Sequence, residues 1–342
     1  MSSRVLVGIL DWGLGHATRS APVIRKFIQD GYEPVIISAG TSLEWLKNEF
    51  PELKTHSLPS LRIRYPSRFS FMLPWYTGWQ LWQSRQAFRN EQKMVEKWTG
   101  YYRPVLIFSD NRPAFFSTRV KSIYMTHQLR VLAPFASRLA TALHRRLMEP
   151  FTEIHVPDFE KEPSLSGKMG HPTEIPKKVK YIGPLSRYTY KPAVEKKDWL
   201  ILLSGPEKQR TVLENIILEH PHLFQGRVVL IRGTTQRAQK AFPSQWEVLD
   251  LANGLEVYRH ALQARRILSR SGYSSLMDWF SWRRKALLVP TPGQPEQVYL
   301  ARHMQHLKWF PCIPQHRLHL LNTHETTSFF RFINSEKPLA HD

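Results

Sequence analysis

The chain has 342 residues, of which 42% are hydrophobic, and this is enough for roughly two globular domains with proper cores. Its 48 Lys and Arg against 28 Asp and Glu give a net charge of +20, which indicates an anionic partner: a phosphorylated substrate, an anionic lipid surface or nucleic acid. The single cysteine, Cys312, excludes an intrachain disulfide framework and favours a reducing, cytoplasmic compartment, and no apolar run approaches the ~18 residues of a membrane-spanning helix.

The N-terminal half alternates short apolar runs with amphipathic segments, which is typical of a parallel, doubly wound α/β domain. Residues 5–10 (VLVGIL) predict a buried strand, residues 11–20 the turn into a helix, and residues 33–38 (EPVIIS) a second strand. Ligands of such sheets bind beyond the carboxyl ends of the strands. His16 is predicted at this rim beside a helix N-terminus, which favours a neutral imidazole that is competent as a catalytic base.

Gly15 forms a Gly-x-Gly pair with Gly13, but a third glycine would have to stand at Thr18 to complete a dinucleotide-binding fingerprint. Two interpretations of this turn stay open. The glycines either let a ligand approach the backbone, with His16 acting on it, or they only make a tight turn that His16 caps.

Two further polar residues follow predicted strands of the same domain. Asp110 comes after residues 104–109 (PVLIFS), and His127 comes after residues 121–126 (KSIYMT). The carboxyl ends of parallel strands lie at one edge of a sheet, so both residues are predicted to contact the acceptor at the rim. For His127 the alternative is a hydrogen bond to neighbouring loops.

Residues 60–105 combine basic and aromatic side chains. Those predicted on an acceptor or membrane side are Arg62, Arg64, Arg68, Trp75, Trp79 and Trp82. Such a mixture suits a membrane surface, where aromatic rings and the stems of basic side chains lie at headgroup level. It also suits a surface on which nucleic-acid bases stack. The third interpretation is a helix that buries its aromatic side chains in the domain core and exposes its charges to solvent.

The polar stretch at residues 191–197 predicts a boundary between a first domain, residues 1–188, and a second domain, residues 189–342. Residues 199–203 (WLILL) begin a new series of buried strands, so the second domain is predicted to be α/β as well. Within it, Leu255–Tyr258 predicts a short strand ahead of a helix.

The stretch Arg270–Asp278 (RSGYSSLMD) predicts a phosphate site. It combines a glycine turn, small hydroxyl residues and an acid within the helix that follows. A helix N-terminus presents unpaired N–H groups and the positive end of a dipole, which suits a phosphate, and Asp278 is then placed for ribose hydroxyls. The alternatives are that Gly272 is an ordinary turn glycine and that Asp278 is a solvated acid.

The residues predicted to bind a nucleotide-sugar donor come from Gly15 and from the turns after the strands of the second half. They are Gly15, Ser204, Gly205, Arg232, Gly233, Arg270, Ser271, Gly272, Ser274, Ser275, Asp278, Gly293, Gln294, Glu296 and Gln297. The last four belong to the loop at residues 290–297 (PTPGQPEQ), whose alternative function is to cap the helix that follows.

Four motifs, spread over both halves, resemble the inverting GT-B glycosyltransferases near the MurG-like and UDP-glucuronosyltransferase-like groups. They are Gly13–Arg19 (GLGHATR), Ser204–Glu207 (SGPE), Ser269–Asp278 (SRSGYSSLMD) and Pro290–Ala301 (PTPGQPEQVYLA). The resemblance implies the GT-B fold, in which two Rossmann-like domains of parallel sheet face each other across a cleft, with the acceptor on the first and the donor on the second. Asp278 stands where a longer Glu is common in that family.

The resemblance implies inverting transfer of a sugar, a hexose or an N-acetylhexosamine, from a UDP-sugar to an acceptor hydroxyl. A lipid-linked or cell-envelope glycan at the inner face of the cell membrane is the candidate acceptor. UDP-sugar is then a co-substrate, no cofactor is implied, and no metal is predicted because the sequence has no Asp-x-Asp motif. Two alternatives stay open: a UDP-sugar hydrolase of the same fold, and a basic nucleic-acid-binding protein, for which no recognisable motif is present.

Overall fold

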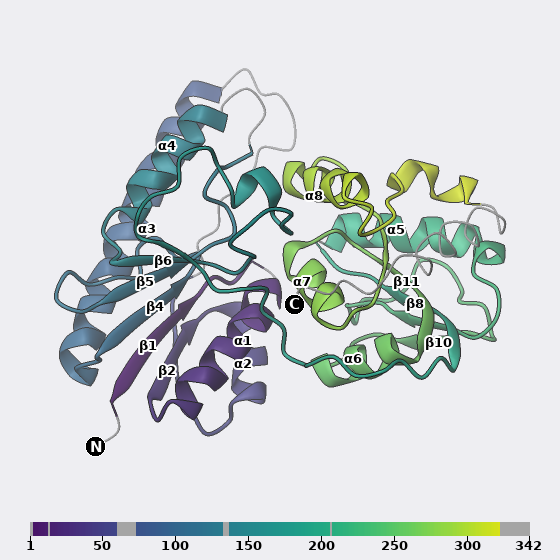
Figure 1. Ribbon diagram of the computed structural model, residues 1–342, viewed down its shortest axis with the longest axis horizontal. Helices are drawn as coiled ribbons and strands as arrows, with labels where there is room; N and C mark the ends of the chain where they lie inside the picture. Colours follow the sequence, from purple (N-terminus) through teal and green to yellow (C-terminus); the bar gives the residue numbers. More distant parts are fainter. Residues whose placement is uncertain (1–2, 13, 60–72, 133–136, 206, 322–342) are drawn as a thin grey trace. The chain divides into compact units, whose positions relative to one another are not determined.

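The computed structural model describes residues 3–12, 14–59, 73–132, 137–205 and 207–321, without the side chains of residues 73–84. The chain forms two α/β units, each built on one parallel sheet (Figure 1). The first unit ends at Gly183, and the second unit continues from Pro184. Short segments before Gly183, Lys161–Lys168 among them, also belong to the second unit. Two parallel sheets with helices are the fold class that the sequence predicts, and this prediction is confirmed.

The first unit has a seven-stranded sheet in the order β3-β2-β1-β4-β5-β6-β7, in which all paired strands are parallel. Its elements are β1 (Arg4–Ile9), α1 (Leu14–Gln29), β2 (Glu33–Ser38), α2 (Gly40–Glu49), β3 (Lys54–Ser57), α3 (Leu73–Tyr102), β4 (Leu106–Asp110), β5 (Ser122–Met125), α4 (Ser137–Met148), β6 (Glu153–Val156) and β7 (Val179–Tyr181). The strand order reverses between β1 and β4, and such a switch point is where ligands of open parallel sheets bind.

Helices cover both faces of this sheet (Figure 1). On one face, Leu6 of β1 and Ile107 of β4 share a buried cluster with Val95 of α3. Phe108 points to the opposite face, because side chains alternate along a strand, and there its ring lies 5.7 Å from that of Phe27 in α1. Burial on both faces explains why these strands read as continuous apolar runs in the sequence.

The described half of α3 packs its apolar side chains into the core of the first unit. Val95 and Tyr102 are buried there, and Trp98 is partly buried against them. For this half of the helix, the structure agrees with the third interpretation of the segment, in which the helix buries its aromatic side chains in the domain core. The predicted membrane residues Arg62, Arg64 and Arg68 lie outside the described residues, as do the side chains of Trp75, Trp79 and Trp82. Within the described chain, no helix has the length and apolar character that crossing a bilayer requires.

The second unit has a five-stranded parallel sheet in the order β10-β9-β8-β11-β12. Its elements are β8 (Lys197–Leu202), α5 (Glu207–Glu219), β9 (Val228–Ile231), β10 (Glu247–Leu249), α6 (Gly254–Gln263), β11 (Ala264–Ser269), α7 (Tyr273–Ser281), β12 (Leu287–Leu288) and α8 (Pro295–His306), with short 3-10 turns at Gly167–Met169, Pro221–Leu223 and Gln315–Leu320. Trp199 and Ile201 of β8, Leu213 of α5 and Leu230 of β9 form part of its core.

The predicted strand at Leu255–Tyr258 is wrong, because these residues lie in α6. Asn253 and Glu256 form a reciprocal capping box ahead of that helix. The backbone N–H of Glu256 donates to Oδ1 of Asn253 at 3.0 Å, and the backbone N–H of Asn253 donates to Oε2 of Glu256 at 2.7 Å. Two terminal N–H groups are thereby satisfied, and this local signal outweighs the β-like character of the short apolar run.

Candidate active site

Polar side chains of the first unit gather at the carboxyl end of β4. Asp110 is the last residue of that strand and is completely buried. It lies beside the end of β1, which leads into α1. That helix begins at Leu14, earlier than the sequence predicts, so its first turns carry His16, Arg19 and Ser20. The cluster therefore lies at the switch point of the sheet.

Asp110 orients the imidazole of His16. Nδ1 of His16 lies 3.1 Å from Oδ1 of Asp110. Although burial alone raises the pKa of the Asp110 carboxyl, the charge of Arg19 and the hydrogen bonds around it hold that pKa well below its usual range. Because the carboxylate can only accept, Nδ1 of His16 carries the proton and Nε2 keeps its lone pair. The His16 side chain is 15% exposed, so a ligand can reach it.

His16 is held neutral near pH 7. Burial lowers its pKa below the usual 6.5, and the positive charge of Arg19 lowers the pKa further, while Asp110 acts in the opposite direction. Burial and the charge of Arg19 therefore favour the neutral imidazole that the sequence predicts. An oriented, neutral imidazole with an available lone pair can take up a proton from a hydroxyl group.

Arg19 connects the His16–Asp110 pair to His127. Nε of Arg19 donates to both oxygens of Asp110, at 3.0 and 2.9 Å. Nη1 of Arg19 lies 3.1 Å from Nδ1 of His127, and since a guanidinium can only donate, this nitrogen of His127 accepts. The hydroxyl of Ser20 donates to Oδ2 of Asp110 at 2.7 Å. The structure thus brings together His16, Asp110 and His127, all predicted at this rim.

Two partners of Asp110, Arg19 and Ser20, were not among the predicted site residues, although Arg19 closes the Gly13–Arg19 motif. They follow His16 by three and four residues, a spacing that puts side chains on one face of a helix, and this signal was available in the sequence. Gly15 is exposed in the first turn of α1, and Gly13 lies outside the described residues.

The turn between β11 and α7 in the second unit carries the predicted phosphate site. Gly272 precedes the helix with φ −71° and ψ 141°, an extended conformation that any residue adopts. If a Cβ were placed on Gly272, it would lie 4.0 Å from Oγ of Ser275, its near neighbour among the described residues. Neither conformation nor packing there requires glycine, and there is room beside Gly272 for a methyl-sized group.

Arg270 and Ser271 tie this turn to the segments around it. Arg270 is 1% exposed, and its guanidinium donates to the carbonyl oxygens of Gln209 at 2.8 Å and Val289 at 3.2 Å. The hydroxyl of Ser271 donates to the carbonyl oxygen of Gln297 at 2.8 Å. The turn is therefore fixed against the start of α5, the end of the β12 segment and the start of α8.

The loop before α8 is organised by Gln297. Its side-chain oxygen accepts from the backbone N–H of Thr291 at 2.9 Å, and its amide nitrogen donates to Oε1 of Gln294 at 2.7 Å. Gly293 has φ +78°, the left-handed conformation that favours glycine. Together with the Ser271 bond, these contacts bring the predicted donor residues of this loop, with Glu296 in the first turn of α8, next to the turn before α7.

Two glycines at the carboxyl ends of β8 and β9 have left-handed φ values, +97° at Gly205 and +72° at Gly233. A Cβ on Gly233 would lie 2.8 Å from the carbonyl oxygen of Leu203, so the backbone itself requires glycine there. Ser204 is exposed beside Gly205. Arg232 is buried, with Nε 2.5 Å from Oε1 of Glu214 and a second ion pair to Asp250, so two acids balance its charge.

Asp278 faces the segment that enters the second unit. Its Oδ1 accepts from the hydroxyl of Ser186 at 2.7 Å, and its Oδ2 lies 3.8 Å from Nη2 of Arg187. Ser186 also accepts from the indole N–H of Trp282 at 2.8 Å. Burial raises the pKa of Asp278 to about 6, although Arg187 and Ser186 act in the opposite direction. This carboxyl, predicted for ribose, already has partners within its own unit.

No family model matches the chain, and a search of the curated proteins finds no match. Solved structures do match over almost all of it. The glycosyltransferase SnogD from Streptomyces nogalater has a TM-score of 0.59 and 15% identity, with 99% of this chain and 96% of that chain covered. MurG from Acinetobacter baumannii has a TM-score of 0.58 and 11% identity, covering 96% and 91%. The glycosyltransferase VinC, in complex with dTDP, has a TM-score of 0.57 and 13% identity, covering 97% and 93%. Identities this low show the fold alone.

Proposed function

We propose that this chain, which has the GT-B fold of those enzymes, is an inverting, metal-independent glycosyltransferase that moves a sugar from a UDP-sugar to an acceptor hydroxyl. The observation that carries this proposal is the His16–Asp110 pair. A buried carboxylate there orients a neutral, partly exposed imidazole at the switch point of the sheet. The dTDP in the VinC structure supports a nucleoside diphosphate as leaving group.

His16 acts as the general base. As the acceptor oxygen attacks the anomeric carbon, its proton passes to Nε2 of His16. The bond between the anomeric carbon and the diphosphate oxygen breaks, and the electron pair leaves with the diphosphate, so the configuration inverts. Asp110 stabilises the imidazolium that forms, as a buried carboxylate does in other His-based sites. A base of this kind contributes about 10²–10⁴-fold to the rate.

The first turn of α7 receives the diphosphate. Its backbone N–H groups and helix dipole stabilise the negative charge that develops on the leaving group. Gly272 lets the diphosphate approach, because a side chain there would occupy the open space. Arg270 and Ser271 act as positioning residues that hold the turn in place. Gln294, Glu296 and Gln297 bind hydroxyl groups of the donor sugar.

The donor sugar is proposed to be a hexose or an N-acetylhexosamine, and the acceptor a lipid-linked or cell-envelope glycan. The basic and aromatic residues in the 60–84 segment and the net charge of +20 support an anionic membrane surface as the working place. Flotation with anionic liposomes tests whether the protein binds an anionic membrane surface. Flotation that is unchanged after Arg62, Arg64 and Arg68 are all replaced by Glu contradicts it.

Thermal-shift measurements with UDP-, GDP- and dTDP-sugars test the donor. A ligand that binds the folded state raises the melting temperature, and we expect the largest rise with a UDP-sugar. If the largest rise occurs with a dTDP-sugar, the nucleobase of the donor is thymine instead of uracil and the proposed reaction stands. If none of these nucleotide-sugars raises the melting temperature, the proposal is contradicted. Release of free sugar from the donor at full rate without acceptor would indicate a hydrolase instead.

A further inference from the structure

A cavity in the first unit is separate from the side chains assigned above. It opens between the loop after β5, the helix α4 and a segment ahead of β7, and its volume is about 580 Å³. It is lined by Arg130, Ser137, Arg138, Thr141, Ala142, Arg145, Pro172 and Thr173. A volume of this size is within the range of small-molecule sites.

The lining of this cavity, which we call the arginine pocket, is strongly basic. It contains three arginines and no acidic residue. For Arg130 and Arg138, the described part of the chain provides no ion-pair partner. Arg145 donates to the carbonyl oxygen of Glu174 at 3.1 Å, and its charged contact with the Glu174 carboxylate is long, at 3.5 Å, with that side chain 84% exposed. The pocket therefore keeps most of its positive charge.

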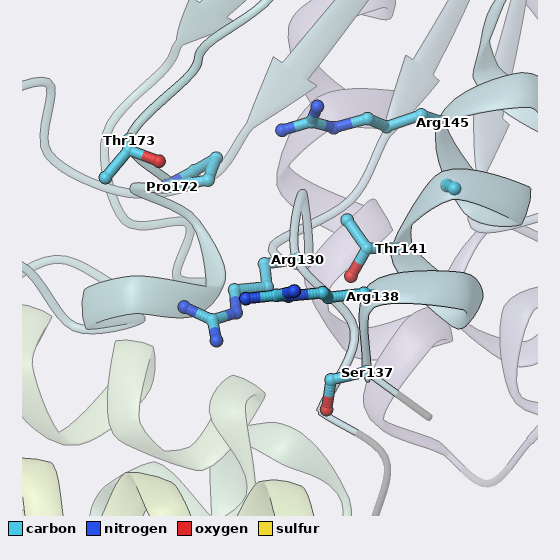
Figure 2. Close-up of a pocket in the computed structure, with 8 residues that line it drawn as sticks. Arg130, Ser137, Arg138, Thr141, Arg145, Pro172 and Thr173 are labelled. Atoms are coloured by element: carbon cyan, nitrogen blue, oxygen red, sulfur yellow. The ribbon is translucent and has the colours of Figure 1, made fainter. Parts of the chain in front are cut away.

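Figure 2 shows Arg130 and Arg138 on one side of the pocket and Arg145 on the opposite side, with Thr141 between them. The hydroxyl oxygen of Thr141 accepts from the backbone N–H of Val131 at 3.1 Å, which leaves its proton to donate. Thr173 adds a second hydroxyl, and α4 begins at the pocket with the positive end of its dipole. Donors thus converge from several sides.

We propose that the arginine pocket binds a phosphate or diphosphate group. Guanidinium groups match phosphate oxygens with pairs of parallel hydrogen bonds, and three of them around one cavity balance the charge of a diphosphate. This site is additional to the one at α7, which lies on the other unit. The group belongs either to a free phosphorylated compound or to the headgroup of a lipid, and both present the same chemistry.

The arginine pocket and His16 are connected through one loop. His127, which contacts Arg19, and Arg130 both follow β5, three residues apart. Resting on the proposed function, this connection implies that the acceptor carries the phosphate, so that its hydroxyl reaches His16 while its anionic group is held in the pocket. The existence of the site does not depend on that step, because binding is measurable without turnover.

Isothermal titration calorimetry of the full chain with inorganic pyrophosphate, in the presence of saturating UDP, tests the site. Arg138→Gln removes one charge from the pocket, and Arg146→Gln is its matched control, since Arg146 lies exposed on the same helix and does not line the pocket. We expect pyrophosphate to bind about tenfold more weakly to R138Q, and more weakly still to the R130Q/R138Q variant, while R146Q stays within about twofold of the wild type. Melting temperatures of the variants check that they fold.

Sedimentation with vesicles distinguishes the two sources. Binding to phosphatidic acid vesicles but not to phosphatidylcholine vesicles, lost in R130Q/R138Q and kept in R146Q, assigns a lipid headgroup. Pyrophosphate binding without vesicle binding assigns a free phosphorylated compound. The proposal is overturned if neither probe binds, if R146Q loses as much affinity as R138Q, or if UDP displaces the pyrophosphate. A failure here leaves UDP-sugar binding and turnover, the tests of the proposed function, untouched.

Discussion

Nδ1 of His16 lies 3.1 Å from Oδ1 of Asp110, although 94 residues separate the two in the chain. They meet because β1 and β4 are neighbours in the sheet, so the helix that follows one strand begins beside the last residue of the other. The contact with the carboxylate places the proton of His16 on Nδ1, so Nε2 keeps its lone pair.

Replacing His16 by Ala should abolish most turnover without affecting the donor. We expect kcat to fall by about 10²–10⁴-fold, the usual contribution of a general base. The melting-temperature rise caused by a UDP-sugar should persist, because the residues proposed for the donor diphosphate belong to the other unit. Steady-state kinetics and thermal shift on the same sample check both. Activity that survives the change would show that His16 is not the base.

Replacing Asp110 by Asn should move the pH profile in a defined direction. In the proposed mechanism activity requires neutral His16, so the rate should fall at low pH as the imidazole gains a proton. Asp110 raises the pKa of His16, against burial and Arg19, which lower it. Its removal should therefore shift the acid limb of kcat/KM to lower pH, while the rate falls because the imidazole loses its orienting acceptor.

The Asp110→Asn variant also loses stability, since it leaves the buried Arg19 without its counter-charge; breaking such pairs costs about 3–5 kcal/mol. Ser20→Ala is the milder control, because it removes one hydrogen bond to the carboxylate and leaves its charge, at about 1 kcal/mol. Denaturant unfolding measures both. An acid limb that moves to higher pH in Asp110→Asn would contradict the assigned charge relationship.

Replacing Gly272 by Ala should separate binding from folding. Because φ is −71° and a new Cβ would lie 4.0 Å from Oγ of Ser275, stability should be unchanged or rise by roughly 0.4–1 kcal/mol through the less flexible unfolded chain. The KM for the UDP-sugar should rise, since the new methyl group occupies space proposed for the diphosphate. Kinetics and thermal unfolding together check the prediction.

Gly233→Ala is the contrasting variant. Gly233 has φ +72°, and its Cβ would lie 2.8 Å from a carbonyl oxygen, so this change should destabilise the fold by at least about 1 kcal/mol. If Gly272→Ala destabilises the protein as much as Gly233→Ala does, the α7 turn has no room for a side chain at Gly272.

Replacing Asp278 by Asn should stabilise the protein at neutral pH. Burial raises the pKa of Asp278 from 3.8 to about 6, so its contribution to the free energy of unfolding is fully present below about pH 4 and is lost as the pH rises through 6. The variant should match the wild type near pH 4.5 and exceed it at pH 7 by on the order of 2 kcal/mol. Denaturant unfolding at the two pH values measures the difference. A variant that is less stable at pH 7 would show that the ion pair with Arg187 outweighs burial.

Much of the fold follows from the sequence because parallel strands such as β1 and β8 are buried on both faces and read as apolar runs. Strand order does not follow, because no local pattern indicates that β4 lies beside β1. For that reason Asp110 is predictable as a rim residue and not as the partner of His16. The arginine pocket is not predictable from the sequence for the same reason. Its residues Arg130, Arg145 and Thr173 come from three separate segments that only folding brings together.

Arg270 illustrates how a loss-of-function result can mislead. Its fork of donors reaches backbone carbonyls on two sides of the turn, a geometry that the single point charge of lysine does not reproduce. An Arg270→Lys enzyme would then fail although the positive charge is preserved, and the failure would resemble that of a ligand contact. Activity lost at this position would measure the integrity of the scaffold beneath the proposed phosphate site, and mutational screens of the motif should be interpreted with that distinction.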